Sequence, residues 1–230
     1  MKLNLKTTLR ILGGLLAVAS IQPACAEGEL MVMPATTKVF SSHDQHVTVK
    51  NTGDAPLYLA VNLQKVTNPG VVPEKKVDLG ELKHPGMLAS PDKLTLGPNQ
   101  TRAISLKSLA EPQQEELYRL YVVPVRSLTV NDAPADKITA PMSVSVGYGV
   151  LVRHMPPPAK QRSGWTHRCE GDGITLENTG NVRQVFTDVV HKSAQSAQTI
   201  AVFPGMPQHF ATKRMTLRID DQPRTLECPR

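Results

Sequence analysis

Residues 142–156 read MSVSVGYGVLVRHMP, and this stretch organises our interpretation of the whole chain. Side chains of a strand alternate between its two faces, so large apolar residues share one face and serine and glycine share the other. The large face is formed by Met142, Val144, Val146, Tyr148 and Val150. We expect the small face to lie close to its own domain, while the apolar ridge fills a groove or joins the core.

The predicted strand ends at a domain boundary. After Arg153 the chain runs into Pro156, Pro157 and Pro158, which lack the N–H groups needed to continue a ladder of backbone hydrogen bonds. Short alternating strands resume beyond this proline run. The sequence therefore predicts two domains, residues 27–155 and residues 156–230.

The first 26 residues have the order of a secretory signal peptide. Lys2, Lys6 and Arg10 precede an apolar run that ends in small residues, so we predict cleavage near Ala26 and export from the cytoplasm. These three basic residues supply half of the formal net charge of +6. Gln22 stands where a lipoprotein signal has an aliphatic residue, which argues against lipidation of Cys25.

Two cysteines remain after removal of this segment, and we predict a disulfide between Cys169 and Cys228. An even pair of thiols in an oxidising compartment is most simply a disulfide. Closing a loop of this length stabilises a domain by about 4 kcal/mol in the chain-entropy account. A zinc site would need more ligands than this pair offers.

The pattern along both parts is typical of β-sandwiches, because short alternating runs are broken by turn residues about every ten positions. No long amphipathic helix is evident. Strands are expected in the first part at 30–40, 46–50, 57–64, 102–106 and 117–125, and in the second at 174–176, 182–190, 199–203, 210–219 and 225–228. Residues 73–85 are expected to form a loop or short edge structure.

The residues of catalytic and metal sites do not form a recognisable motif. The nearest approach is His43-Asp44-Gln45-His46, which a solvated loop explains better than a metal site. The chain has no Gly-rich phosphate loop and no G-x-S-x-G sequence. Its basic residues are interspersed with acids and aromatic residues are few, which disfavours nucleic-acid binding. We expect a binding protein without cofactor or metal, and not an enzyme.

Several phrases taken together resemble the periplasmic chaperones of the chaperone/usher pathway, the PapD-like superfamily. They are GMLASPDKLTLGPNQTRAISL at 86–106, EELYRLYVVPV at 115–125, the strand at 142–156, NTGN at 178–181 and VFPG at 202–205. VTNPGVVPEKKVDL at 66–79 resembles the alternate clade that serves class 5 colonisation pili. The resemblance implies an all-β protein with two immunoglobulin-like domains set at an angle.

The same resemblance implies donor-strand complementation in the periplasm. Pilin subunits lack one strand of their own sandwich, and the chaperone lends a strand to fill the exposed groove before delivery to the outer-membrane usher. On this sequence the ridge from Met142 to Val150 would enter that groove. Five buried side chains offer on the order of 10 kcal/mol before association costs. The same ridge is expected to allow self-association when no pilin occupies it.

Two charged sites are also implied by the resemblance. The terminal carboxylate of the pilin would be held by basic residues on the first strand and the donor strand, for which the candidates are Arg153, Thr37 and Lys38. An acid at the entry of a later strand would pair with a basic residue near the hinge. Glu115 and Glu116 match the acid, and Arg153 could serve either purpose.

The alternative hypothesis is a secreted two-domain adhesin or minor pilus subunit of immunoglobulin type. In such a protein, residues 142–150 would be an ordinary core strand. An adhesin or pilin is expected to carry an alternating N-terminal extension for strand exchange, whereas the predicted strand at 30–40 follows the cleavage site closely and contains Pro34. A periplasmic hydrolase is a more distant alternative.

Overall fold

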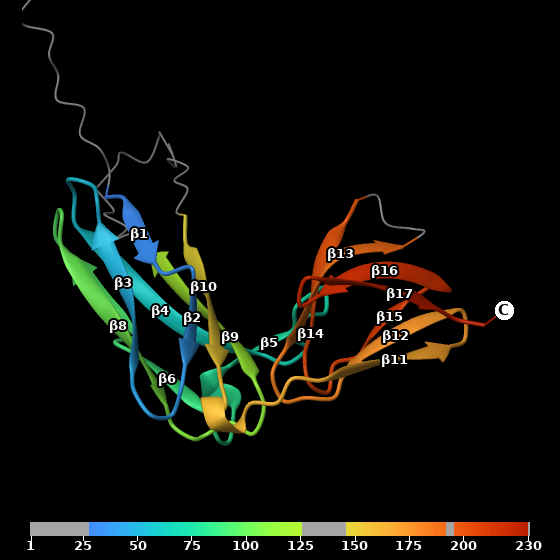
Figure 1. The fold of residues 1–230 in the computed structure, drawn as a ribbon. Helices are drawn as coiled ribbons and strands as arrows, with labels where there is room; N and C mark the ends of the chain where they lie inside the picture. Colours follow the sequence, from blue (N-terminus) through green and yellow to red (C-terminus); the bar gives the residue numbers. More distant parts are fainter. Residues whose placement is uncertain (1–27, 126–145, 192–195, 230) are drawn as a thin grey trace, which may run out of the picture.

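The computed structural model describes residues 28–125, 146–191 and 196–229, and these residues form two β-sandwiches that meet at an angle (Figure 1). The predicted signal peptide lies outside the described residues. Apart from two short 3₁₀ turns, η1 (Leu79–Glu81) and η2 (Pro158–Lys160), the regular structure in these ranges consists of strands. No described helix has the length and apolarity needed to cross a membrane.

The first sandwich contains ten strands that belong to two sheets. They are β1 (Leu30–Met33), β2 (Thr36–Val39), β3 (Gln45–Asn51), β4 (Leu57–Val66), β5 (Lys76–Asp78), β6 (Met87–Ser90), β7 (Lys93–Leu96), β8 (Thr101–Ser108), β9 (Glu116–Pro124) and β10 (Tyr148–His154). One sheet has the order β1-β3-β8-β6. The other has the order β2-β10-β9-β4-β5, with β7 also paired to β4.

The extended segment predicted at 30–40 forms two strands in different sheets. Proline cannot donate a backbone hydrogen bond to a neighbouring strand. Pro34 lies between β1, which pairs with β3, and β2, which pairs with β10. The core between the two sheets is made by the alternating residues of both. Val47, Leu59, Ile104, Leu120 and Val152 are among its buried members.

The second sandwich is smaller and contains the remaining strands. They are β11 (Trp165–Glu170), β12 (Gly173–Asn178), β13 (Gln184–His191), β14 (Gln198–Val202), β15 (Gln208–Phe210), β16 (Arg214–Ile219) and β17 (Gln222–Glu227). The sheet β11-β12-β15 packs against the sheet β14-β13-β16-β17 around a core that includes Phe186 and Leu217. The sequence pattern predicted neither β6 nor β11 as strands; β11 is almost entirely exposed, so it has no apolar periodicity.

The predicted disulfide between Cys169 and Cys228 is confirmed. It joins β11, the first strand of the second sandwich, to the residue that follows β17, the last. The two strands lie at the edges of different sheets, so the bond connects the two layers of this sandwich.

Candidate functional site

Strand β10 has a free edge at its N-terminal end. Its residues from Tyr148 to His154 pair with β9, but β2 pairs only with the part that begins at Leu151 (Figure 1). Val146 and Tyr148 are 70% and 40% exposed. The beginning of β10 therefore offers unpaired backbone groups next to exposed apolar side chains, the combination that permits pairing with another chain.

The prediction that Val150 belongs to an exposed ridge is wrong. Val150 is 2% exposed and packs in the core of the first sandwich together with Val152. β2 joins β10 at the next residue, Leu151, and from Val150 onward the face that carries Val146 and Tyr148 lies in the space between the two sheets. Met142 and Val144, the other ridge residues, lie outside the described residues.

The small face lies close to its own domain, as expected, but on the outer face of the sheet. Gly147 and Gly149 lie opposite to the core, beside side chains of β9. A Cβ atom at Gly147 would lie 3.0 Å from Cγ2 of Val123, and one at Gly149 would lie 3.4 Å from Cε1 of Tyr121. The side chains of Val123 and Tyr121 on β9 therefore lie close against the two glycines on this outer face.

Arg153 is held by a buried carboxylate at the junction of the two sandwiches. Its Nε and Nη2 donate to Oε1 and Oε2 of Glu115 at 2.6 and 2.9 Å. The Glu115 carboxylate also accepts from the backbone N–H of Arg183 at 2.8 Å, and its own backbone N–H donates to the carbonyl of Asn181. Glu115 thus joins β10 of the first sandwich to the β12–β13 turn of the second.

The electrostatics of this junction depend on Glu115. The Arg183 guanidinium lies 3.9 Å from Glu115. Burial and the nearby charge of Arg153 lower the pKa of Arg183, and the charge of Glu115 opposes this. Two guanidinium groups therefore share one buried carboxylate, to which Arg153 makes two hydrogen bonds.

The two residues expected on the first strand lie on different faces of β2. Thr37 pairs with Val152 and is half-buried, whereas Lys38 pairs with Arg153 and is exposed. Paired residues of adjacent strands share a face, so Lys38 and Arg153 both point to the outer side. The structure therefore brings Lys38, and not Thr37, beside Arg153.

Glu116 belongs to a second polar cluster, on the other side of β9 from the junction contacts of Glu115. Lys65 donates to its Oε1 at 2.6 Å, and the Tyr118 hydroxyl donates to its Oε2 at 2.7 Å. His154 is buried, with Nδ1 3.5 Å from Oε2 of Glu116 and Nε2 2.8 Å from the Ser108 hydroxyl. The cluster links β4, β8, β9 and β10 immediately before the proline run.

The cluster changes the acidity of its members. Burial opposes ionisation of Glu116, but the close contact with His154, the hydrogen bonds from Lys65 and Tyr118 and the charge of Lys65 outweigh it, and the pKa of Glu116 falls to about 2. Burial and the bond to Glu116 raise the pKa of Tyr118 well above its usual value. Glu116 is therefore an ionised structural group.

A loop from the first sandwich makes another contact with the second. The side-chain amide of Gln208 donates to the carbonyls of Gly70 and Ala201 at 2.9 and 3.0 Å. Gly70 has a φ of +84°, and a Cβ there would lie 2.5 Å from the Ala201 carbonyl oxygen. Glycine is required at this position, because the conformation is left-handed and no side chain would fit.

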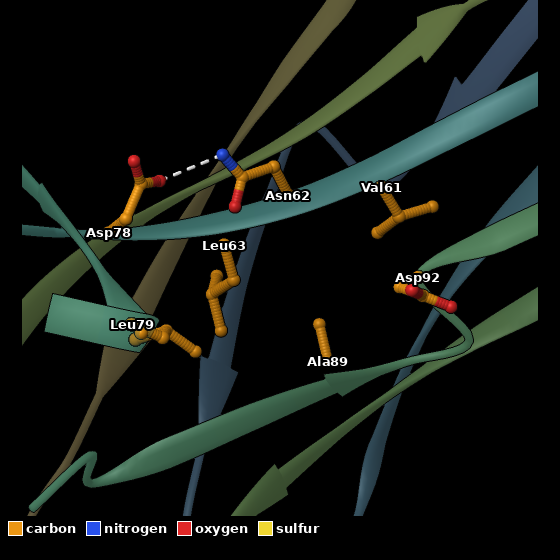
Figure 2. Close-up of a pocket in the computed structure, with 8 residues that line it drawn as sticks. Val61, Asn62, Leu63, Asp78, Leu79, Ala89 and Asp92 are labelled. Atoms are coloured by element: carbon orange, nitrogen blue, oxygen red, sulfur yellow. Dashed lines mark hydrogen bonds between the residues drawn. The ribbon is translucent and has the colours of Figure 1, made fainter. Parts of the chain in front are cut away.

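An open pocket on the first sandwich lies between β4, η1 and β6 (Figure 2). Its volume is about 310 Å³, and its lining combines aliphatic and acidic residues, namely Val61, Asn62, Leu63, Asp78, Leu79, Gly80, Ala89 and Asp92. Asn62 and Gln64 donate to Asp78, and these hydrogen bonds lower its pKa. The lining includes no histidine, cysteine or serine.

Metal-ligating residues do not gather elsewhere in the described ranges. No group of three or more His, Cys, Asp or Glu side chains within residues 28–125, 146–191 and 196–229 could hold a metal ion. The candidate binding site is the free edge of β10 with the exposed apolar side chains beside it.

Solved structures share the whole fold. The class 5 fimbriae chaperone CfaA is 20% identical, with a TM-score of 0.68 over 87% of this chain and 100% of that chain. A chaperone–tip adhesin complex of CFA/I fimbriae biogenesis gives a TM-score of 0.67 at 19% identity, over 86% of this chain and 98% of that chain. The fold is that of a pilus chaperone.

A third solved structure has a similar fold at lower sequence identity. In the CsuC–CsuE chaperone–tip adhesion subunit complex of Acinetobacter baumannii, the matching chain is 14% identical, with a TM-score of 0.58 over 86% of this chain and 97% of that chain. The resemblance inferred from the sequence phrases is therefore confirmed at the level of the fold, including its two immunoglobulin-like domains.

Sequence relatives carry fimbrial names. A CFA/I fimbrial subunit of Escherichia coli is 26% identical over 168 residues, which are 73% of this chain and 70% of the relative. A CS1 fimbrial subunit of Escherichia coli is 24% identical over 164 residues, 70% of this chain and 67% of the relative. No family model matches the sequence.

Proposed function

We propose that this protein is a periplasmic chaperone that binds and folds pilin subunits by donor-strand complementation and delivers them to an outer-membrane usher. The free edge of β10 carries this proposal, because it presents unpaired backbone groups beside the exposed Val146 and Tyr148. The alternation of residues 142–146 continues the same apolar face towards the N-terminus. A pilin that lacks one strand could pair with this edge and bury these side chains.

The burial of Met142, Val144, Val146 and Tyr148 supplies the energy in this proposal. Each fully buried side chain of this size is worth about 1.5–3 kcal/mol, from which the costs of association and ordering are subtracted. Val150 does not contribute to binding of the pilin, because it already lies in the core. Binding of this kind needs neither a nucleotide nor a catalytic group.

The two domains have separate roles in the proposal. We place their boundary at the proline run, with residues 27–155 and 156–230 as the units, since strands β1–β10 and β11–β17 form separate sheets. The first domain carries the proposed donor strand. The contacts of Glu115 and Gln208 hold the second domain against it. Residues 1–26 are proposed as the signal peptide that directs the chain to the periplasm.

Similar proteins support this proposal by what they bind. Two of the similar solved structures are complexes of a chaperone with a tip adhesin or a tip adhesion subunit, and another similar structure is described as a periplasmic chaperone. The sequence relatives are named as fimbrial subunits, and this observation favours the alternative of a minor pilus component. In that alternative the protein would remain in the assembled fibre, whereas a chaperone would be absent from it.

The test is co-purification from the periplasm followed by co-expression. The tagged chain should recover a small protein, identified by mass spectrometry, and co-expression should protect that protein from proteolysis in a one-to-one complex. Val146→Glu should abolish recovery while the chain remains folded. A wild-type chain found in isolated pili, or one that fails to protect any co-expressed pilin, would contradict the proposal.

A further inference from the structure

Polar side chains hold the C-terminal end of β10 on both faces of its sheet. On the outer face, Nε and Nη2 of Arg153 donate to Glu115 at 2.6 and 2.9 Å. On the core face, Nε2 of His154 lies 2.8 Å from the Ser108 hydroxyl, and its Nδ1 lies 3.5 Å from Oε2 of Glu116. Two consecutive residues of β10 thus contact two consecutive acids where β9 begins, and together these contacts form a polar clasp.

His154 is an unusual residue for its position in the core. Its side chain is 1% exposed and lies on the same face of β10 as Val150 and Val152. The Ser108 hydroxyl donates to the Ala110 carbonyl at 3.0 Å, so it accepts from the Nε2–H of His154. Its Nδ1 makes no hydrogen bond to a residue in the described part of the chain. A buried polar atom without a partner costs free energy, so its presence in a core calls for a role that an apolar residue would not fill.

The remainder of β10 specifies its register on β9 only weakly. In the structure Tyr148 pairs with Val122, and Gly149 pairs with Tyr121. Large and small residues alternate through SVGYGV at 145–150. A shift by one residue would turn the apolar face outward, but a shift by two residues keeps every large side chain on its face. Apolar packing alone therefore discriminates little between registers that are two residues apart.

The polar clasp distinguishes these registers. A shift by two residues in either direction replaces both His154 and Arg153 with apolar residues or proline. The buried carboxylate of Glu115 would then lose its two hydrogen bonds from Arg153, at high cost. The arginine side chain is long enough to follow its partner over part of such a shift, whereas the histidine ring is enclosed by the core. His154 is therefore the more selective half of the clasp.

We propose that His154 is a positioning residue that sets the register of the donor strand β10 on β9, with support from Arg153. This inference rests on the proposed function, in which the groove of the pilin follows the exposed side chains of Val146 and Tyr148. A shift of β10 by two residues would move these side chains, and the pilin with them, by about 7 Å along the sheet. His154 thereby fixes where the bound pilin lies relative to the two sandwiches.

Cross-strand nuclear Overhauser contacts measure this register in the free protein. In the wild type, Gly149 should contact Tyr121, its partner in the structure. His154→Phe should add a second set of contacts, from Gly149 to Arg119 or Val123, which lie two residues away on β9. His154→Leu is measured in parallel, since the smaller side chain fits if the phenylalanine ring does not. A single register in these apolar variants would overturn the inference.

Two control variants separate register from stability. His154→Gln keeps an N–H donor for the Ser108 hydroxyl and should retain a single register. Val152→Ala removes buried volume beside His154, so it should lower the melting temperature but leave the register unchanged. A second register in Val152→Ala would show that loss of stability is sufficient, and would contradict a special role of His154.

Binding of the pilin recovered with the wild-type chain gives an independent measurement. We expect His154→Phe to weaken the complex by about tenfold, and His154→Gln and Val152→Ala to leave it nearly unchanged. Equal weakening by His154→Phe and Val152→Ala would refute the inference, because stability alone would then explain both losses. If the wild-type chain recovers no pilin, the proposed function fails, whereas the register in the free protein still tests the role of His154.

Discussion

Glu115 determines what Arg153 can do. From the sequence, Arg153 could either hold the pilin carboxylate or pair with the acid near the hinge. In the structure its Nε and Nη2 both donate to the buried carboxylate of Glu115. A buried ion pair adds little net stability when it forms, but the loss of one partner leaves an unpaired charge at high cost. The junction therefore depends on the acid more than on either cation.

Glu115→Gln should destabilise the protein by about 3–5 kcal/mol, because Arg153 and Arg183 would share a buried site without a counter-charge. Urea unfolding followed by circular dichroism measures this loss. Glu111→Gln is the control, since Glu111 forms an exposed pair with Lys160 and should change stability by less than about 1 kcal/mol. Equal effects of the two variants would show that the buried carboxylate has no special role.

Glu116 makes stability depend on acid pH. Its pKa is about 2 in the folded protein, compared with the unperturbed value of 4.5 that applies to the unfolded chain. The folded state therefore favours the ionised form. The resulting stabilisation is complete above pH 4.5 and is lost as the pH falls from 4.5 towards 2. Urea midpoints across this range should therefore decline more in the wild type than in Glu116→Gln. Parallel curves for both proteins would contradict this assignment.

Strand β10 changes its role along its length. From Leu151 onward it lies between β2 and β9, and its apolar face belongs to the core. Before Leu151 it pairs with β9 alone, and the same face is exposed at Tyr148 and Val146. One alternating pattern therefore serves the protein's own core and, in the proposed function, the core of a pilin.

Val146→Glu and Val150→Glu should separate these two roles. A carboxylate at the exposed position 146 should leave the melting temperature near the wild-type value and abolish recovery of the pilin. At position 150 the charge would enter the core, so we expect several kcal/mol of destabilisation or failure to fold. Thermal melting and co-purification measure the two effects. Destabilisation by Val146→Glu equal to that by Val150→Glu would favour the adhesin alternative.

At the scale of the whole molecule, the two sandwiches are stabilised in different ways. The first has the larger core, which spans most of its strands. The second has a smaller core and a disulfide between its first strand and the end of its last. Small domains commonly rely on such covalent links, because their cores bury too little apolar surface.

Replacement of Cys169 and Cys228 by serine should destabilise the second domain by about 4 kcal/mol, since the unfolded chain loses the restriction on a long loop. Calorimetry or hydrogen exchange should show this loss mainly in β11–β17. Protection of β3, β4 and β8 should change less. Uniform loss of protection in both sandwiches would instead indicate that they unfold as one unit.

The sequence by itself determined the all-β class, the two sandwiches, the disulfide and the resemblance to pilus chaperones. These follow from local alternation, turn residues, a single remaining pair of cysteines and short phrases whose order is visible along the chain. Glu115 and Arg153 were also visible as candidates. Local sequence patterns predict these features because strand periodicity and covalent chemistry do not depend on which strands are neighbours.

Only the tertiary structure decided which side of each strand faces which partner. The sequence could not show that β2 joins β10 at Leu151, so Val150 was wrongly placed in the exposed ridge. The same is true of the contact between Gly70 and Gln208 and of the contact between Ser108 and His154. These features depend on strand order and register, which bring together residues that are distant in sequence.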